Sequence, residues 1–200
     1  MEDSNITMDA IDTTCGYLEL IIGPMFSGKT SKLLELYKQY TYCNISVAVI
    51  NHSLDNRYSD TMLSNHAKHM VPCIRASKLR DIWNTSGSES TQANVIKEVS
   101  VVLINEGQFF EDLYDVVCEM VNANKKVYIC GLDGDYKRNK FGQIHDLIPM
   151  CDNVYKIRSL CGLCKNGRSG IFSKRVVESD KQTLIGIDNY IPVCRTCYDK

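Results

Sequence analysis

The segment from Gly23 to Thr30 reads Gly-Pro-Met-Phe-Ser-Gly-Lys-Thr, a complete G-x-x-x-x-G-K-[ST] phosphate-binding motif. Backbone N–H groups of such a loop, together with the positive end of a following helix, hold phosphate oxygens. Lys29 adds a positive charge for the β- and γ-phosphates, and the Thr30 hydroxyl can bind Mg²⁺. We therefore expect a nucleoside triphosphate site with Mg²⁺ as cofactor, formed by Gly23, Pro24, Met25, Phe26, Ser27, Gly28, Lys29 and Thr30.

A second chemical element follows the mainly apolar run Val99–Ile104, which ends in Asn105 and Glu106. Phosphate-loop enzymes hold Mg²⁺ with an acidic group at the end of a buried strand, and here an asparagine stands at that point. A carboxylate beside the phosphate loop can accept a proton from an attacking hydroxyl or orient a water. Glu106 is therefore a candidate general base, and a surface glutamate at a strand end is the alternative.

Asp55 and Arg57 follow another predicted strand, residues 46–50. Open α/β sheets bind ligands beyond the carboxyl ends of their strands, so this loop is expected at the same crevice. Asp55 could hold Mg²⁺ through water, and Arg57 could neutralise charge on a phosphoryl group in transit. A solvated charge cluster is equally consistent with these two residues.

Four of the ten cysteines form two C-x-x-C pairs that are separated by 29 residues. Two such pairs complete a tetrahedral Cys₄ zinc site with no position left for water, so the predicted zinc is structural. Two disulfides or inert thiols are the alternatives, and a redox dithiol is disfavoured because neither pair is expected at a strand–helix turn. The predicted zinc ligands are Cys161, Cys164, Cys194 and Cys197, and the other six are expected to be buried free thiols: Cys15, Cys43, Cys73, Cys118, Cys130 and Cys151.

The elements that must position these residues alternate between strands and helices. Apolar runs predict strands, and residues spaced along one face predict helices. This alternation predicts an α/β fold with a mostly parallel sheet between helices. The predicted strands are 17–22, 46–50, 99–104 and 127–131, the predicted helices are 28–42 and about 113–121, and 84–94 is expected to be an exposed loop. We expect a disordered tail at 1–14, an α/β domain at 15–152 and a small zinc-binding domain at 153–200.

Composition excludes some partners. The 23 Lys and Arg residues face 24 Asp and Glu, so no basic excess favours nucleic acid. There is no run of eighteen apolar residues, so no membrane span is expected. The polar, acidic first residues do not resemble a secretory signal, and we expect a reducing, cytoplasmic location.

These motifs, taken in order, resemble the type II thymidine kinases of the cytosol and of large DNA viruses. The resemblance also rests on Leu132-Asp133-Gly134 and on Val193-Cys194-Arg195-Thr196-Cys197-Tyr198, and it covers residues 17 to 198. It implies a RecA-like P-loop fold with a small zinc-ribbon and lasso domain. It implies transfer of the ATP γ-phosphate to the 5′-hydroxyl of thymidine, a homotetramer, and feedback inhibition by dTTP.

The resemblance also implies roles for individual residues. Glu106 is then the general base, Arg57 the phosphate-stabilising arginine beside Lys29, and Asp55 a Mg²⁺-site carboxylate near Thr30 and Asn105. The family's aspartate is Asn105 here, which is expected to affect metal affinity or rate. Residues 182–190 resemble a lasso loop over the nucleoside. The implied thymidine-binding residues are Met25, Phe109, Leu132, Tyr136, Phe141, Ser173, Gln182, Leu184, Ile185, Gly186 and Tyr190. Packing in a core is the ordinary alternative for any one of the aromatic rings.

Two other functions stay open at this point. One is a zinc-ribbon P-loop ATPase that acts on nucleic acid. The other is a nucleotide-binding relative that Asn105 has weakened as a catalyst.

Overall fold

A computed structural model describes residues 14–55, 61–64, 69–83, 91–179, 181–184 and 186–200. Its centre is a six-stranded sheet in the order β5-β2-β6-β7-β1-β8, in which every strand pair is parallel. This sheet confirms the predicted α/β class. Its strands are β1 (Tyr17–Ile22), β2 (Val47–His52), β5 (Ile74–Ala76), β6 (Val101–Asn105), β7 (Lys126–Gly131) and β8 (Asn153–Lys156).

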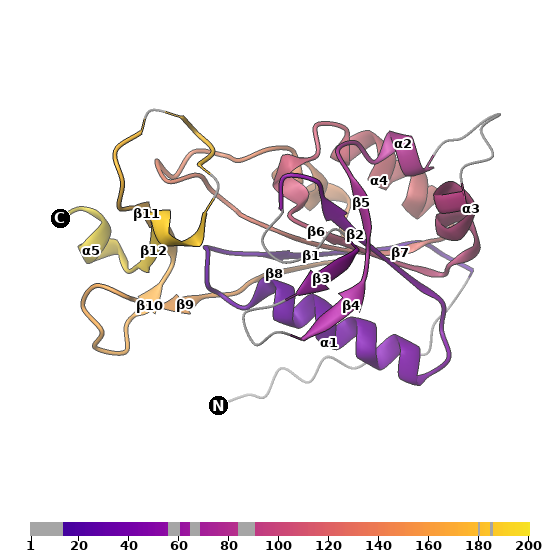
Figure 1. The fold of residues 1–200 in the computed structure, drawn as a ribbon, viewed down its shortest axis with the longest axis horizontal. Helices are drawn as coiled ribbons and strands as arrows, with labels where there is room; N and C mark the ends of the chain where they lie inside the picture. The colour runs from indigo at the N-terminus through magenta and orange to yellow at the C-terminus, as the bar shows by residue number, and fades with distance from the viewer. Residues whose placement is uncertain (1–13, 56–60, 65–68, 84–90, 180, 185) are drawn as a thin grey trace.

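Helices cover both faces of this sheet. Figure 1 shows α1 (Lys29–Tyr42) on one face and α2 (Arg80–Trp83), α3 (Thr91–Glu98) and α4 (Leu113–Asn122) on the other. Strand β6 contributes to both cores: Val102 and Ile104 belong to the cluster that includes α4, whereas Val101 and Leu103 belong to the cluster that includes α1. A strand buried on both faces reads as an apolar run, which is why the sequence pattern located it.

Shorter elements complete the fold. Strands β3 (Met62–Ser64) and β4 (Met70–Pro72) pair antiparallel, and two 3-10 helices, η1 (Gly107–Phe109) and η2 (Ile144–Met150), follow β6 and β7. The C-terminal part, orange to yellow in Figure 1, lies beyond one end of the sheet. It contains the antiparallel pairs β9 (Ser159–Leu160) with β10 (Ser169–Gly170) and β11 (Phe172–Arg175) with β12 (Tyr190–Val193), and also η3 (Ile187–Asn189) and α5 (Arg195–Tyr198).

The expected domain boundary at residue 152 falls just before β8, which still pairs with β1 in the main sheet. The chain leaves that sheet after Lys156. A division of the chain into an α/β unit and a zinc-binding unit stays a proposal. The expected tail at 1–14 lies outside the described residues except for Thr14.

One prediction about this fold is wrong in part. Residues 91–94, expected as the end of an exposed loop, form the first half of helix α3, and residues 84–90 lie outside the described part. The reason is tertiary packing: Ile96 in the second half of α3 is fully buried in the core cluster. Most of a helix's stability in a protein comes from such packing rather than from the composition of its first turn. Within the described residues, no helix is long and apolar enough to cross a membrane.

Candidate functional site

The phosphate loop joins the end of β1 to the start of α1. Gly23 has φ 152°, and a Cβ there would lie 2.3 Å from the Ile157 carbonyl oxygen. Gly28 has φ 89° at the N-cap of α1, a left-handed conformation that favours glycine. The Lys29 ammonium lies over the loop, where it donates to the Pro24 carbonyl at 2.6 Å and to Ser27 Oγ at 3.4 Å. The loop thus has the compact geometry and the buried positive charge that a phosphate site requires.

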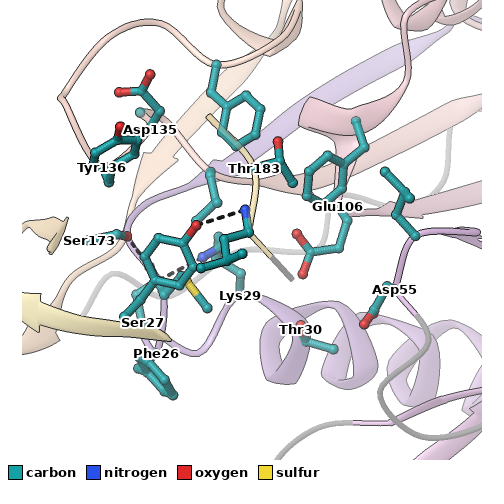
Figure 2. A pocket seen from close by; sticks show the side chains of 18 of the residues that line it. Phe26, Ser27, Lys29, Thr30, Asp55, Glu106, Asp135, Tyr136, Ser173 and Thr183 are labelled. Atoms are coloured by element: carbon teal, nitrogen blue, oxygen red, sulfur yellow. Dashed lines mark hydrogen bonds between the residues drawn. The ribbon is translucent and has the colours of Figure 1, made fainter. Parts of the chain in front are cut away.

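Glu106 follows β6 in a left-handed backbone conformation, φ 54° and ψ 43°. Non-glycine residues in this region carry strain that often accompanies function. Figure 2 shows the Glu106 carboxylate facing the same space as Thr30 and Asp55, and all three residues line one pocket. The candidate base is therefore beside the phosphate loop, as predicted.

Gln108 holds the Glu106 carboxylate in place. Its Nε2 donates to Glu106 Oε2 at 2.7 Å, and its Oε1 accepts from the Leu132 N–H at 2.9 Å. Because a backbone N–H can only donate, it fixes the amide with its nitrogen toward the carboxylate. Sequence reasoning did not assign Gln108 a role. The signal in the sequence was a polar residue two positions after the base, and the structure shows that this residue is only 3% exposed.

The three predicted Mg²⁺ residues also come together. Thr30 Oγ1 donates to Asn105 Oδ1 at 3.4 Å, and Asn51 connects Asn105 to Asp55 by two further hydrogen bonds. The donor set is a hydroxyl, an amide oxygen and a carboxylate, and oxygen ligands of this kind fit Mg²⁺. Arg57 lies outside the described residues, so its predicted role stays untested.

An aromatic slot adjoins the phosphate loop in the same pocket. Phe109 and Phe141 meet edge to face, with ring centroids 5.6 Å apart, and Tyr136 lines the same pocket. Ser173 on β11 accepts a hydrogen bond from the Met25 N–H at 2.9 Å, which ties the C-terminal part to the phosphate loop. The pocket includes every described residue predicted for thymidine binding: Met25, Phe109, Leu132, Tyr136, Phe141, Ser173, Gln182, Leu184, Gly186 and Tyr190. Ile185 lies outside the described residues.

Arg175 on β11 holds residues from a segment that lines this pocket. Its guanidinium lies 3.7 Å from the centroid of the Tyr136 ring and donates to the Tyr190 hydroxyl at 2.7 Å. It also donates to the carbonyls of Ser179, Lys181 and Gln182. Five planar donors on one side chain can hold several loop carbonyls at once, which a lysine cannot reproduce. Sequence reasoning missed Arg175, because most of its hydrogen bonds go to backbone carbonyls that no motif specifies.

Asp135, next to Tyr136 in the chain, also holds this segment. It accepts from Gln182 Nε2 at 3.0 Å and from the backbone N–H groups of Lys137 and Asn139. Burial opposes its ionisation, but these hydrogen bonds outweigh that effect and lower the pKa of the Asp135 carboxyl. The carboxylate is therefore ionised at neutral pH and can anchor Gln182.

The four predicted zinc ligands form one cluster, with all Sγ atoms within 4.8 Å of one another. Burial alone raises the pKa of the Cys161 thiol, but nearby backbone N–H groups, that of Cys164 first, donate to it and lower its pKa to about 6. Burial and the neighbouring thiols raise the pKa of Cys197 to about 12. Thiolates this close together repel one another, and a cation such as Zn²⁺ with tetrahedral coordination would neutralise them.

One argument against a redox dithiol was wrong: Cys194 does lie at a strand–helix turn, between β12 and α5. The close approach of all four thiols still favours a metal. The other six cysteines are free, as expected, but only Cys130 is buried, whereas Cys15 and Cys43 are exposed. Cys15 precedes β1 and Cys43 is the C-cap of α1, so neither thiol lies within a buried strand.

Comparison with known proteins shows to which family this chain belongs. The family model described as thymidine kinase matches residues 16–198. This chain belongs to the thymidine kinase family. A thymidine kinase of Oryza sativa subsp. japonica is 39% identical to it over 194 residues, which is 96% of this chain and 69% of the relative. A Variola virus thymidine kinase is 39% identical over 184 residues, 92% of this chain and 97% of the relative.

The thymidine kinase match extends to animals. A Bos taurus protein named thymidine kinase, cytosolic, is 32% identical over 197 residues, 98% of this chain and 77% of the relative. The family drawn from the sequence motifs is thus confirmed, and with it the class of ATP-dependent phosphotransferase.

Proposed function

We propose that this protein transfers the γ-phosphate of ATP to the 5′-hydroxyl of thymidine or deoxyuridine. Its relatives are named for the reaction with thymidine. One observation carries the proposal: a single pocket holds the phosphate loop, Glu106 and an aromatic slot. A phosphate donor and a flat base can therefore bind with the acceptor hydroxyl beside a carboxylate.

The residues divide the work as follows. The phosphate loop and Lys29 hold the triphosphate, and Glu106 accepts the proton of the 5′-hydroxyl as the new P–O bond forms and the bond to ADP breaks. Thr30, Asp55 and Asn105 would hold Mg²⁺, directly or through water, and the bound ion neutralises charge on the phosphates. Arg57 is proposed to add positive charge at the transferred group.

The base would lie against the rings of Phe109, Tyr136 and Phe141, under the segment 182–190. Backbone groups of a closed segment reject a larger ring by clash and by leaving polar groups unpaired. Since the pocket joins a base slot to a phosphate loop, one dTTP molecule could occupy both parts, which supports feedback inhibition by dTTP. We also propose a structural zinc at the four cysteines, a homotetramer, and a cytosolic location like that named for the bovine relative.

A steady-state comparison of nucleosides with Mg²⁺ and ATP tests this function. We expect turnover of thymidine and deoxyuridine, with kcat/KM for deoxyguanosine at least about a hundredfold lower. Equal kcat/KM for thymidine and deoxyguanosine would overturn the base specificity. ATP turnover that responds to single-stranded DNA but not to thymidine would favour the nucleic-acid ATPase. Nucleotide binding without phosphoryl transfer at any Mg²⁺ concentration would identify a weakened relative.

A further inference from the structure

Asn51 joins the parts of the site that are proposed to hold Mg²⁺. It lies on β2 directly beside Asn105 of β6, because the two residues are partners in the parallel ladder. Asn105 Nδ2 donates to Asn51 Oδ1 at 2.9 Å, and Asn51 Nδ2 donates to Asp55 Oδ2 at 3.3 Å. Asn51 and Asn105 are 2% and 1% exposed, so both amides depend on protein partners for their hydrogen bonds.

The Asp55 carboxylate fixes the direction of each hydrogen bond in this series. An ionised Asp55 carboxylate can only accept, so Asn51 must present its nitrogen to Asp55 and its oxygen to Asn105. Asn105 must then present its nitrogen to Asn51, which leaves its oxygen facing Thr30. The Thr30 hydroxyl donates to that oxygen at 3.4 Å, so its lone pairs remain available for a cation.

We propose that Asn51 is a positioning residue that aligns Asp55, Asn105 and Thr30 for Mg²⁺ bound with ATP. This inference rests on the proposed function, because it concerns the metal that phosphoryl transfer requires. Asn51 lies outside every sequence motif of the site, and its role follows from its two hydrogen bonds.

The proposal also bears on the asparagine at position 105. A carboxylate introduced by Asn105→Asp would face the Asn51 oxygen. Asn51 could turn its amide nitrogen toward that new group, but its oxygen would then face the Asp55 carboxylate. One amide therefore cannot serve carboxylates on both sides, and Asn105 matches Asn51 better than an aspartate would. Part of any gain in Mg²⁺ binding from a charge restored at 105 alone should therefore be offset by the loss of a buried Asn51 hydrogen bond.

The test measures nucleotide binding and not turnover. A non-hydrolysable ATP analogue is titrated calorimetrically into wild type, Asn51→Leu and Asn51→Asp, once with EDTA and once with Mg²⁺. The quantity compared is the ratio of the two Kd values, which is the Mg²⁺-dependent gain in affinity. In both variants we expect this gain to fall about fivefold to tenfold, as loss of buried hydrogen bonds predicts. The Kd in EDTA should stay within about twofold, because the phosphate loop is untouched.

Val49→Ala is the matched control. Val49 lies on the same strand and is buried in the cluster on the α1 side of the sheet. It should lower the unfolding midpoint and leave the Mg²⁺-dependent gain unchanged. An equal fall in this control, or an unchanged gain in both Asn51 variants, would overturn the proposal.

An exchange of side chains separates alignment from packing. In Asn51→Asp with Asp55→Asn, the new amide at 55 can donate to the new carboxylate at 51, which still accepts from Asn105. The double variant should therefore recover part of the gain lost in Asn51→Asp, and purely additive losses would contradict the relay. Thymidine phosphorylation by wild type reports separately on the function. If it occurs while the Asn51 variants keep the full Mg²⁺ gain, only this inference fails. If it is absent while the variants lose the gain, only the proposed function fails.

Discussion

The Gln108 amide donates to the Glu106 carboxylate over 2.7 Å, and the same amide is held by the backbone N–H of Leu132. Leu132 follows β7, whereas Glu106 follows β6, so the candidate base is fixed by a contact from the neighbouring strand. The left-handed backbone of Glu106 is thus supported through its side chain as well.

Glu106→Gln tests the base itself. The amide has nearly the same shape but cannot accept the 5′-hydroxyl proton, so we expect kcat to fall about 10²–10⁴-fold. Steady-state kinetics with thymidine, beside a thermal unfolding curve, measures this. A kcat within about threefold of wild type would show that another group takes the proton.

Gln108→Leu tests how the base is positioned. Removing the donor takes away one of the contacts that orient the carboxylate, so we expect kcat to fall about tenfold while the KM values for ATP and thymidine change less than about threefold. Gln143→Leu is the control, since Gln143 also accepts from a backbone N–H, that of Tyr114, but does not line the pocket. Equal losses in the two variants would point to general destabilisation.

How far the sequence predicts this site depends on the kind of contact involved. The phosphate loop, Glu106 and the cysteine pairs were predictable because their chemistry sets residue types and spacing. Gln108, Asn51 and Arg175 were not, because each also depends on a partner that only the fold brings near. These partners are Leu132, Asn105 and Tyr136, respectively. The same holds for helix α3, whose first turn looks like a loop until the burial of Ile96 is known.

Zinc content checks the cysteine cluster. We expect one zinc per chain by metal analysis, with Zn–S distances of about 2.3 Å by X-ray absorption. Cys164→Ser should lower the zinc content and the unfolding midpoint, whereas Cys43→Ser, at an exposed thiol, should change neither. Metal-free protein with two disulfides under reducing conditions would contradict the site.

Arg175→Lys tests how Arg175 holds the segment that lines the nucleoside part of the pocket. The ammonium cannot span three carbonyls and the Tyr190 hydroxyl, so the segment should close less well over the nucleoside. We expect the KM for thymidine to rise about tenfold and the KM for ATP to change less than about twofold. Arg168→Lys, at an exposed arginine outside the pocket, should be neutral. A larger effect on ATP than on thymidine would refute the assignment.

Glu19 should give stability a measurable pH dependence. Burial is the main cause that raises the pKa of this carboxyl, against a hydrogen bond from Tyr17 and the charge of Lys32. Among the described residues, its buried Oε1 has no hydrogen-bond partner. The folded protein thus holds the proton more tightly than the unfolded chain, so this group's contribution to stability falls as pH rises from the unfolded pKa through the folded one.

Glu19→Gln removes that titration. The unfolding free energy of the variant minus that of wild type should be larger at pH 8 than at pH 4.5. Urea denaturation at both pH values measures this difference. Glu35→Gln, at the exposed partner of Lys32, serves as the control and should show a much smaller pH-dependent difference. A wild-type minus variant difference that is constant with pH would disprove the prediction.

The strand order has a consequence for how the protein is made. Strand β1, which carries the phosphate loop, pairs only with β7 and β8 within the described sheet, and both lie more than a hundred residues later in the chain. During synthesis on a ribosome, β2 and β6 can pair before β7 and β8, the partners of β1, have been made. Contacts of such long sequence separation form slowly. The strand that leads into the phosphate loop is therefore paired later than β2 and β6, and a nascent chain completes its nucleotide site only after β7 and β8 have been made.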